Sequence, residues 1–345
     1  MELILITVIV PCRNEERHIT ETIQNIIKQN GIDEKFTFEL FVIDGMSNDR
    51  TVELVKKEIE NNNRIKIFFN LKKITPAAFN IGINNAKGEY ICILGAHAKI
   101  SKEYLINCLN TISKVNADNV GGPWKAEGYG YVGKAIALAF QSLFSAGGAK
   151  SHNLNYEGYV DTVWGGFYKR EVFERIGLFD EELIRNQDDE LNYRLIKNGG
   201  KIWQAPDIKY SYICRSSVKS LFRQYIQYGY WKVRVIQKHK IPASIRHLIP
   251  GMFVFMILLS AILSIFLEIF FNIFKGSIII YIGLDMLISL CICIRLINIK
   301  YFLILPIIFA IFHFGYGFGF LKGVLDFVIL RRYKKKKIKD ASLTR

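Results

Sequence analysis

The sequence predicts an α/β domain with a doubly wound sheet, followed by a helical domain in a membrane. Over the first 100 residues, short continuous apolar runs alternate with segments of helical periodicity, a pattern typical of parallel strands buried between helical layers. From Leu248 to Leu330 the chain is mostly Ile, Leu, Phe and Gly. Half of the 345 residues are hydrophobic, yet the formal net charge is +15, a combination that soluble enzymes seldom show.

The apolar runs predict strands at 6–11, 38–43, 65–69 and 90–94, and a final strand at 201–206. Helical spacing follows the first three runs at 19–27, 51–59 and 75–86. Ligands in such sheets bind beyond the carboxyl ends of the strands. The polar residues at these ends are Arg13, Asn14 and Glu15 after the first strand, Asp44 and Asp49 after the second, and His97 after the fourth.

The absence of several known motifs argues against particular modes of nucleotide binding, a cysteine metal site and a signal peptide. A GxGxxG fingerprint is absent after the first predicted strand and a P-loop is absent from the sequence, which disfavours dinucleotide and ATP binding in those modes. The six cysteines show no paired metal spacing, as expected for small buried hydrophobes in a reduced cytosolic compartment. Met1 to Thr7 has no basic n-region and no small-residue cleavage site, so a signal peptide is not expected.

Two local patterns each have two interpretations. Asp44 can hold a nucleoside through acceptor hydrogen bonds to the base or ribose, or it can cap the turn that follows. Asp188, Asp189 and Glu190 are three consecutive carboxylates that open a helical pattern. Helix N-termini tolerate negative charge because of their dipole and unpaired N–H groups. Alternatively, one of the three carboxylates is a general base.

Three groups of motifs carry a family resemblance. They are Val8-Ile9-Val10-Pro11 with Asn14-Glu15, then Val42-Ile43-Asp44-Gly45 with Ser47, Asp49 and Thr51, and then Ala77-Ala78-Phe79-Asn80-Ile81-Gly82 with Ala86, Gly88, Glu89 and Tyr90. Their order and spacing resemble the nucleotide-sugar domain of family 2 inverting glycosyltransferases. Ala96-His97-Ala98, Trp164-Gly165-Gly166 and the segment Asn186 to Arg194 resemble the succinoglycan-type exopolysaccharide branch. The resemblance implies a GT-A fold with a doubly wound mixed sheet, a nucleoside-diphosphate sugar donor and inversion at the anomeric carbon.

The resemblance also implies roles for particular residues. Asp188 lies at the position of the family's catalytic base, with Gln187 in place of the usual Glu, and Glu190 is expected to support the following helix. Lys72 and Lys73 are candidates to stabilise the leaving diphosphate, and exposed lysines on a surface loop are the alternative. The residues expected to line the donor's base and ribose are Pro11, Arg13, Asn14, Glu15 and Asp44.

One departure from the family affects the metal. The family carries Asp-x-Asp at the end of the fourth strand, where this chain has Gly95-Ala96-His97. A neutral imidazole can bind Mn²⁺, whereas Mg²⁺ prefers oxygen ligands. With His97 as the remaining side-chain ligand, a divalent metal would be held largely by the diphosphate and water. A structural role for His97 is the alternative.

The acceptor side is assigned to Trp164, Gly165, Gly166, Gln187, Gln224 and Trp231. Trp164 can stack on a sugar face or pack in the core, and the two glycines let backbone approach a sugar closely. Processive members carry Gln-x-x-Arg-Trp, of which 224–228 keeps Gln224 and loses the Arg and Trp, so transfer of a single sugar is favoured. The segment 129–149 is either a flexible acceptor loop or a helix against the membrane.

Composition divides the chain into a GT-A domain (1–240), a membrane domain (241–330) and a basic cytoplasmic tail (331–345). Spans are expected at about 248–271 and 276–297, with a turn at Asn272 to Lys275 between them. Because positive charge favours the cytoplasm, 301–330 is expected to be re-entrant or interfacial, with a third span as the alternative. The protein is therefore expected to be a multi-pass plasma-membrane protein with its catalytic domain in the cytoplasm, and its tail can bind anionic lipid.

Two functions are considered. The first is a membrane-anchored inverting glycosyltransferase that moves a single sugar from a nucleoside-diphosphate sugar to a lipid-linked or other saccharide acceptor in polysaccharide or glycoconjugate biosynthesis. The second is a catalytically silent scaffold or sugar-binding membrane protein, motivated by the missing Asp-x-Asp. Nucleic-acid binding is not expected, because no RNA-binding module accompanies the aromatic and basic residues of 223–232.

Overall fold

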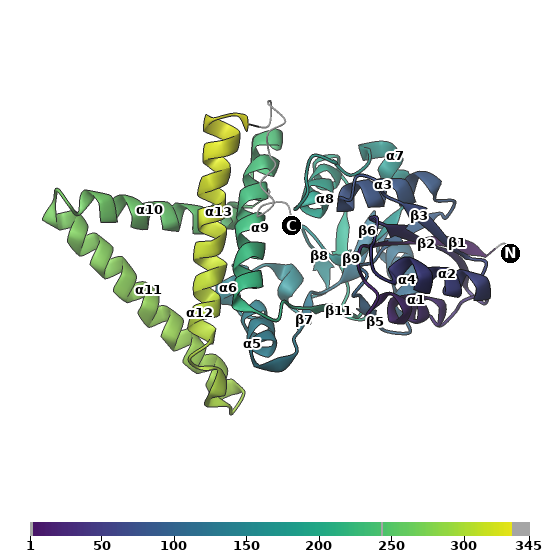
Figure 1. The fold of residues 1–345 in the computed structure, drawn as a ribbon, viewed down its shortest axis with the longest axis horizontal. Helices are drawn as coiled ribbons and strands as arrows, with labels where there is room; N and C mark the ends of the chain where they lie inside the picture. Colours follow the sequence, from purple (N-terminus) through teal and green to yellow (C-terminus); the bar gives the residue numbers. More distant parts are fainter. Residues whose placement is uncertain (1–2, 243, 333–345) are drawn as a thin grey trace. The chain divides into compact units, whose positions relative to one another are not determined.

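The chain forms two compact units, which are described separately (Figure 1). The computed structural model describes residues 3–242 and 244–332. The first unit comprises Met1–Lys125 and Lys150–Ile213, and the second comprises Ala126–Ala149 and Cys214–Arg345. Composition predicts a boundary near Lys240, whereas the last boundary between the units falls between Ile213 and Cys214. Residues 126–149 belong to the second unit and form an insertion within the sequence of the first.

The first unit consists of strands and helices that follow one another along the chain. They are β1 (Ile4–Cys12), α1 (Ile19–Ile27), β2 (Phe36–Asp44), α2 (Thr51–Asn61), β3 (Ile65–Phe69), α3 (Thr75–Asn85), β4 (Tyr90–Ile93), β5 (Lys99–Ile100), α4 (Tyr104–Val115), β6 (Asn119–Gly122), η1 (Lys150–His152), β8 (Gly158–Tyr159), β9 (Trp164–Lys169), α7 (Glu171–Ile176), α8 (Gln187–Lys197), β10 (Ile202–Gln204) and β11 (Tyr210–Ile213). The short strand β7 (Lys125–Glu127) contains the first boundary between units.

An eight-stranded mixed sheet organises the first unit, with strand order β3-β2-β1-β4-β9-β6-β10-β8. β1 pairs in parallel with β2 and β4, and β2 pairs in parallel with β3. β9 is antiparallel to both of its neighbours, β4 and β6. The doubly wound mixed sheet is therefore confirmed, and the predicted strands at 6–11, 38–43, 65–69, 90–94 and 201–206 correspond to β1, β2, β3, β4 and β10.

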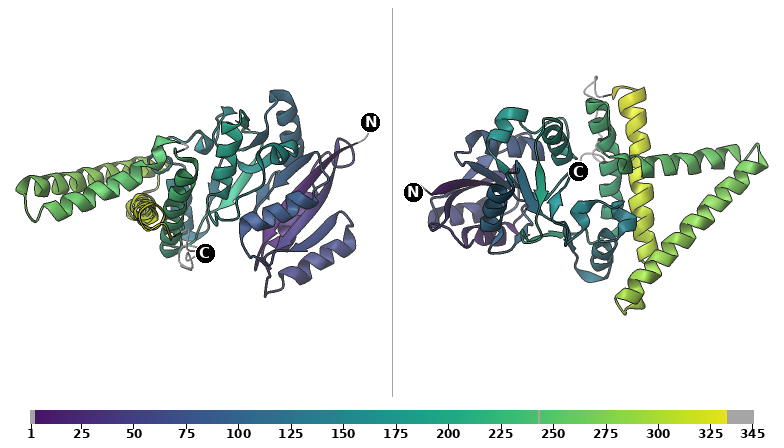
Figure 2. Two further views of the ribbon diagram at one scale, coloured as in Figure 1. Left: turned by 90° about the horizontal axis from the view of Figure 1, so that it is seen from above. Right: turned by 180° about the vertical axis from the view of Figure 1, so that it is seen from behind.

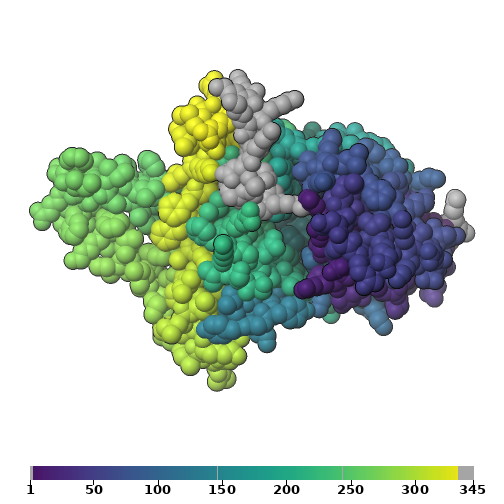
Figure 3. All heavy atoms as spheres, viewed as in Figure 1, coloured from purple at the N-terminus to yellow at the C-terminus, as the bar shows by residue number. Residues whose placement is uncertain are grey.

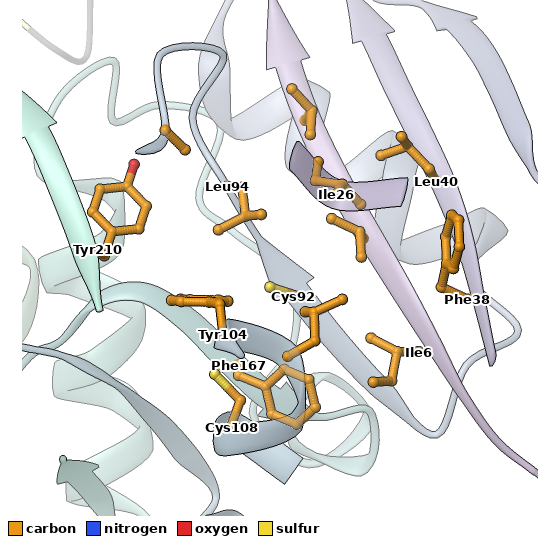
Figure 4. Close-up of a cluster of buried hydrophobic side chains, with 14 of the residues drawn as sticks. Ile6, Ile26, Phe38, Leu40, Cys92, Leu94, Tyr104, Cys108, Phe167 and Tyr210 are labelled. Carbon is orange, nitrogen blue, oxygen red and sulfur yellow. The ribbon is translucent and has the colours of Figure 1, made fainter. Parts of the chain in front are cut away.

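Helices cover both faces of this sheet because its strands are apolar on both sides. In β1, Ile6, Val8 and Val10 face one cluster of buried side chains, to which α1, α2 and α4 contribute. Ile9, of opposite parity, faces a second cluster supplied by α3, α7 and α8. Figure 4 shows part of the first cluster, where side chains from strands and helices interdigitate. This alternation is the period of two that places successive strand residues on opposite faces.

The second unit consists mainly of apolar helices. Its elements are α5 (Gly130–Phe140), α6 (Leu143–Ala146), α9 (Val218–His239), η2 (Ile245–His247), α10 (Ile249–Leu263), α11 (Glu268–Arg295), η3 (Ile299–Tyr301), α12 (Leu305–Ala310), α13 (Tyr316–Gly323) and the π-helical turns η4 (Ile311–Gly315) and η5 (Val324–Ile329). Three helical stretches among the described residues are long and apolar enough to cross a membrane, namely Ile245–Leu263, Glu268–Arg295 and Leu305–Ile329. The protein is thus a membrane protein.

Two of these stretches expose most of their apolar surface. Figures 1 and 2 show α10 and α11 as two long helices joined at one end, and Figure 3 shows their surface in pale green. Exposed side chains on them include Met252 and Phe255 of α10 and Ile279 and Ile280 of α11. Apolar surface of this extent is expected to face lipid.

The predicted turn at Asn272 to Lys275 is wrong, because these residues lie inside α11. The chain turns earlier, between Leu263 and Glu268, and Glu268 lies in the first turn of α11, where the helix dipole favours negative charge. Residues 305–329 form one continuous helical stretch. Whether it crosses the membrane stays a prediction, and the basic tail beyond Arg332 lies outside the described residues.

Close backbone contact joins α9 to the helical stretch 305–329. A Cβ added at Gly229 of α9 would collide with the carbonyl oxygen of Tyr316, and one added at Gly319 would collide with the carbonyl oxygen of Ile226. A third close approach occurs at Gly323, where the carbonyl oxygen of Tyr230 would lie 2.7 Å from a Cβ. Small residues that let two helix backbones approach are typical of packing in membranes.

We expect Gly229→Ala to destabilise the helical unit by about 2 kcal/mol, because the added methyl group meets backbone rather than a movable side chain. The matched control is Gly276→Ala in α11, where nothing lies within 4 Å of the new Cβ and alanine is the better helix former. Thermal denaturation in detergent measures both variants. An unchanged midpoint for Gly229→Ala would contradict the close packing of these helices.

Candidate active site

Strand direction brings the predicted site residues to one edge of the sheet. Cys12 at the end of β1 pairs with Asp44 at the end of β2, so the segments that follow both strands begin at the same level. β9 runs antiparallel to β4, so Trp164 at its beginning lies toward the carboxyl end of β4. Gly122, the last residue of β6, pairs with Trp164.

The loops after β1 and β2 are joined by hydrogen bonds. Asp44 is buried and accepts hydrogen bonds from the backbone N–H of Ser47, at 2.9 Å, and from its hydroxyl group. The backbone N–H of Asn14 donates to Ser47 Oγ at 2.8 Å, and Asn14 Oδ1 accepts from the N–H of Asn48 at 2.9 Å. Asp44 therefore does cap the turn that follows it. A contact of Asp44 with a nucleoside stays a prediction.

His97 lies beside a carboxylate from the first loop. Its Nε2 is 3.0 Å from Glu15 Oε1, and its ring contacts that of His18 edge to face at 4.6 Å. The segment is fixed next to α1 because the hydroxyl of Thr22 donates to the carbonyl of Ala96 at 2.7 Å. Glu15 and His97, which the sequence places at the ends of two strands on the same sheet edge, thus form one pair.

This pair differs from the ligand set that the family uses for a divalent metal. Gly95 offers no side chain, and the described residues contain no group of three or more His, Cys, Asp or Glu side chains arranged to hold a metal ion. The side chains present therefore do not fit a site in which the protein supplies most of the ligands.

Lys72 is bound to a carboxylate. Its Nζ forms an ion pair with Glu181, and Asn80 Nδ2 donates to the same carboxylate at 3.1 Å. The hydrogen bond from Lys72 lowers the pKa of Glu181, against a smaller opposing effect of burial. Lys73 adopts a positive φ of 59°. The loop that carries both lysines is thereby tied to the segment that precedes α8.

Two tryptophans stack beside the glycine turn. The ring centroids of Trp124 and Trp164 lie 4.4 Å apart with 12° between their planes, and Tyr212 contacts both rings at their edges. Gly165 has a φ of 62° and accepts a hydrogen bond from the hydroxyl of Tyr104. Sequence reasoning missed Trp124, although Gly121-Gly122-Pro123-Trp124 is a turn with an aromatic end, much like the one at Trp164.

The three carboxylates of α8 lie in different environments. Glu190 is fully buried and binds Arg194 through two parallel hydrogen bonds of 2.8 and 2.9 Å. Arg194 also donates to the carbonyls of Ile176 and Leu178. Glu190 therefore anchors α8 to the segment after α7, while Asp188 and Asp189 are half-buried in the first turn.

Asp188 lies near a hydrogen-bonded group that joins α8 to the sheet. Burial raises the pKa of Tyr168, and the negative charge of Asp188 raises it further. The hydroxyl of Tyr168 donates to Asn192 Oδ1 at 3.2 Å, and Asn192 Nδ2 donates to Thr162 Oγ1 at 3.0 Å. Asn192 is one helical turn after Asp188, so these contacts fix the start of α8.

Comparison with known proteins identifies the family. A family model described as "Glycosyl transferase family 2" matches residues 7–177. A Methanococcus voltae protein is 33% identical over 331 residues, which are 93% of this chain and 97% of that protein. It is the dolichyl N-acetyl-alpha-D-glucosaminyl phosphate 3-beta-D-2,3-diacetamido-2,3-dideoxy-beta-D-glucuronosyltransferase. The chain belongs to glycosyltransferase family 2. This confirms the resemblance seen in the sequence.

Two further relatives agree with this assignment. The succinoglycan biosynthesis protein ExoA of Rhizobium meliloti is 27% identical over 245 residues, which are 70% of this glycosyltransferase and 73% of ExoA. A solved mannosyltransferase, PcManGT from Pyrobaculum calidifontis in complex with GDP-Man and Mn²⁺, has a TM-score of 0.53 and 20% sequence identity. The match covers 69% of this chain and 65% of that chain, and it shows the shared GT-A fold.

Arg13 and Gln187 are among the described side chains of the glycosyltransferase that have a buried polar atom without a hydrogen-bond partner. Arg13 Nε and Gln187 Oε1 make no hydrogen bond to any of the described residues. Buried polar groups are almost always paired in native proteins, so these atoms are expected to bind water or substrate. Both residues belong to the predicted site, one on the donor side and one beside Asp188.

The remaining predicted acceptor residues of the glycosyltransferase lie in α9 of the second unit. Gln224 Nε2 donates to the hydroxyl of Tyr228 at 2.9 Å. Trp231 is 1% exposed and contacts Phe327, with 5.8 Å between ring centroids. Trp231 thus packs in the core of the helical unit. A role of either residue in acceptor binding stays a prediction.

We expect Glu190→Ala to destabilise the glycosyltransferase by about 3 to 5 kcal/mol, because it leaves the guanidinium of Arg194 without its carboxylate. The control is Glu174→Ala, an exposed position in α7, which is expected to change stability by less than about 0.5 kcal/mol. Thermal denaturation of both variants tests this. Equal midpoints would show that the ion pair does not anchor α8.

Proposed function

We propose that this glycosyltransferase moves a single sugar from a nucleoside-diphosphate sugar to a lipid-linked saccharide acceptor at the cytoplasmic face of the plasma membrane. The observation that carries the proposal is the 33% identity, over 93% of the chain, to a transferase named for a dolichyl-linked sugar phosphate. The three apolar helical stretches support an acceptor held in a membrane. The GDP-Man complex of PcManGT supports a nucleotide-sugar donor.

The donor is proposed to bind at the carboxyl edge of β1, β2 and β4. Pro11, Arg13, Asn14, Glu15 and Asp44 all belong to the ends of β1 and β2 or to the loop after β1, and hydrogen bonds between the two loops hold them in place. Arg13 has a buried Nε without a partner among the described residues, so a donor oxygen can complete its hydrogen bonding. Lys72 and Lys73 are proposed to face the diphosphate.

The acceptor hydroxyl is proposed to attack the anomeric carbon from the face opposite the diphosphate. A bond forms between the acceptor oxygen and the anomeric carbon, and the bond from that carbon to the diphosphate oxygen breaks. The electron pair leaves with the nucleoside diphosphate, and the hydroxyl proton passes to Asp188 as general base. Glu190 is unsuited to this role, because it is fully buried and bound by Arg194.

The neighbours of Asp188 support its assignment. Asp188 lies in the first turn of α8, where the N-terminal end of the helix favours negative charge. Gln187 offers an unpaired buried Oε1 that can accept a hydrogen bond from an acceptor hydroxyl. Trp164, stacked on Trp124, is proposed to face the acceptor sugar with its remaining apolar surface.

The side chains near His97 are not proposed to hold a divalent metal ion on their own. The pair formed by Glu15 and His97 is too small a ligand set for a protein-held divalent ion, so the growing charge of the diphosphate falls to basic side chains and N–H donors. His97 is proposed to contribute one of these donors, or one ligand to an ion that arrives with the diphosphate.

We expect Asp188→Asn to lower the turnover number at least about 100-fold while donor binding is retained, because the amide cannot accept the proton. The matched control is Asp189→Asn in the same helical turn, which is expected to keep most of the activity. The assay follows release of nucleoside diphosphate with a polyprenyl-linked acceptor, and calorimetry follows donor binding. Activity that survives Asp188→Asn would refute this base.

We also expect the double substitution Gly95→Asp with His97→Asp to lower the half-saturating Mn²⁺ concentration about tenfold or more, because two carboxylates replace one imidazole. Position 95 tolerates a side chain, since the nearest atom to a new Cβ is the Tyr210 hydroxyl oxygen at 3.5 Å. Turnover is measured against Mn²⁺ concentration. An unchanged Mn²⁺ dependence would show that this loop does not control metal use.

A catalytically silent scaffold is the second candidate, because the Asp-x-Asp motif is missing. It would be favoured if the purified native chain released no nucleoside diphosphate from any nucleotide-sugar in the presence of lipid-linked acceptors.

A further inference from the structure

The insertion 126–149 is bound to the ends of the membrane-length helices within the second unit. The hydroxyl of Tyr131 donates to the carbonyl of Lys300 at 2.6 Å, and its ring stacks on Tyr301 with 5.5 Å between centroids. Farther along, His313 Nε2 lies 2.9 Å from the carbonyl oxygen of Phe144. The insertion therefore packs against the segment between α11 and α12 and against the helical stretch 305–329.

A pocket of about 430 Å³ opens between the insertion and the end of α11. One wall consists of residues 126–138 and the other of residues 296–301. The residues that line it are Ala126, Glu127, Gly128, Tyr129, Lys134, Ala137, Leu138, Leu296, Asn298 and Tyr301. All of them belong to the second unit, so the pocket is a feature of that unit alone.

The lining combines one cation, Lys134, and one carboxylate, Glu127, with hydrogen-bonding groups and an apolar wall. Lys134 is exposed and forms no ion pair within the described ranges 3–242 and 244–332. Tyr129 is 61% exposed, and Asn298 on the opposite wall contributes a side-chain amide. Leu138 and Leu296 supply apolar surface. This set suits an amphiphile with an anionic head.

The position of the pocket along the helices points to the headgroup layer of a membrane. α11 ends at Arg295 and α12 begins at Leu305, so the segment between them joins two membrane-length stretches. Three tyrosines gather there, at 129, 131 and 301, and tyrosine is enriched where membranes meet water. Basic residues at 295 and 300 add positive charge at the same level.

We propose that this pocket binds the phosphate of a polyprenyl-linked acceptor, and this inference rests on the proposed function. Lys134 pairs with the phosphate, and the side-chain amide of Asn298 donates a hydrogen bond to it. The first isoprene units lie along Leu138 and Leu296.

Binding to the full-length chain in zwitterionic detergent tests the proposal without requiring turnover. The probes are polyprenyl monophosphate, uncharged polyprenol and phosphatidylglycerol, each measured by native mass spectrometry. We expect polyprenyl monophosphate to bind more tightly than polyprenol, and Lys134→Gln to weaken its binding about tenfold or more. Ala137→Phe, which fills the pocket, is expected to weaken it as well. Lys114→Gln, an exposed lysine of α4, is the control and should leave binding unchanged.

Each possible result either supports or overturns the assignment of the pocket as the acceptor phosphate site. Loss of polyprenyl monophosphate binding in Lys134→Gln, with phosphatidylglycerol unaffected, supports the acceptor site. Equal loss for both lipids means that the pocket takes bulk anionic lipid, which overturns its assignment to the acceptor. No loss with either variant overturns the pocket as a phosphate site. A chain that binds polyprenyl monophosphate through Lys134 but shows no turnover would refute the proposed function and leave the binding site standing.

Discussion

The direction of four adjacent strands in the eight-stranded sheet determines where the loops of the first unit lie. β2, β1 and β4 run parallel and end together, and β9 runs against them. Parallel strands alone would bring only their carboxyl-terminal loops to one edge. Reversal of β9 adds the beginning of a strand to that edge, so Trp164 and Gly165 share it with residues more than a hundred positions earlier in the chain. The antiparallel pairing of β9 with β4 therefore brings the proposed acceptor turn to the edge where the proposed donor loops lie.

The three carboxylates in the first turn of α8 differ in their burial and in their partners. Three neighbouring carboxylates at a helix start would repel one another if all were alike, but they are not. Glu190 is neutralised by Arg194 inside the protein, which reduces the repulsion on the other two and fixes the helix. Asp188, one turn before the buried Asn192, is then presented by a helix end that cannot easily shift. Glu190 thus has a structural role, and the chemical role proposed for Asp188 lies two positions earlier.

Sequence reasoning succeeded where a pattern had one physical cause. The apolar runs of β1, β2 and β4 could be predicted because residues on both faces of those strands are buried. β6 escaped notice because its four residues include two glycines, which pack against backbone and carry no apolar signal. The pairing of Glu15 with His97 joins residues far apart in sequence, and no local pattern encodes such contacts.

The wrong prediction of a turn at Asn272 to Lys275 in the helical unit has a similar origin. Asn272 and Lys275 suggested a turn by their polarity, yet long polar side chains can reach water from within a helix near a membrane surface. Trp231 was predicted to contact the acceptor, and its packing against Phe327 shows that the ring is buried, so this role stays a prediction. Side chains of this kind fit either a core or a ligand, and sequence alone does not separate the two.

The insertion 126–149 has a consequence for how the protein is made. It is synthesised between β6 and β9, yet the helices against which it packs emerge roughly 150 residues later, a delay of about 8 to 30 s at 5 to 20 residues per second. During that interval the apolar face of α5 has no native partner, while the strands on either side can already pair. A nascent chain released after Ile213 would keep that face exposed to solvent. The order of translation therefore makes folding of the last helices the step that completes the packing of the insertion.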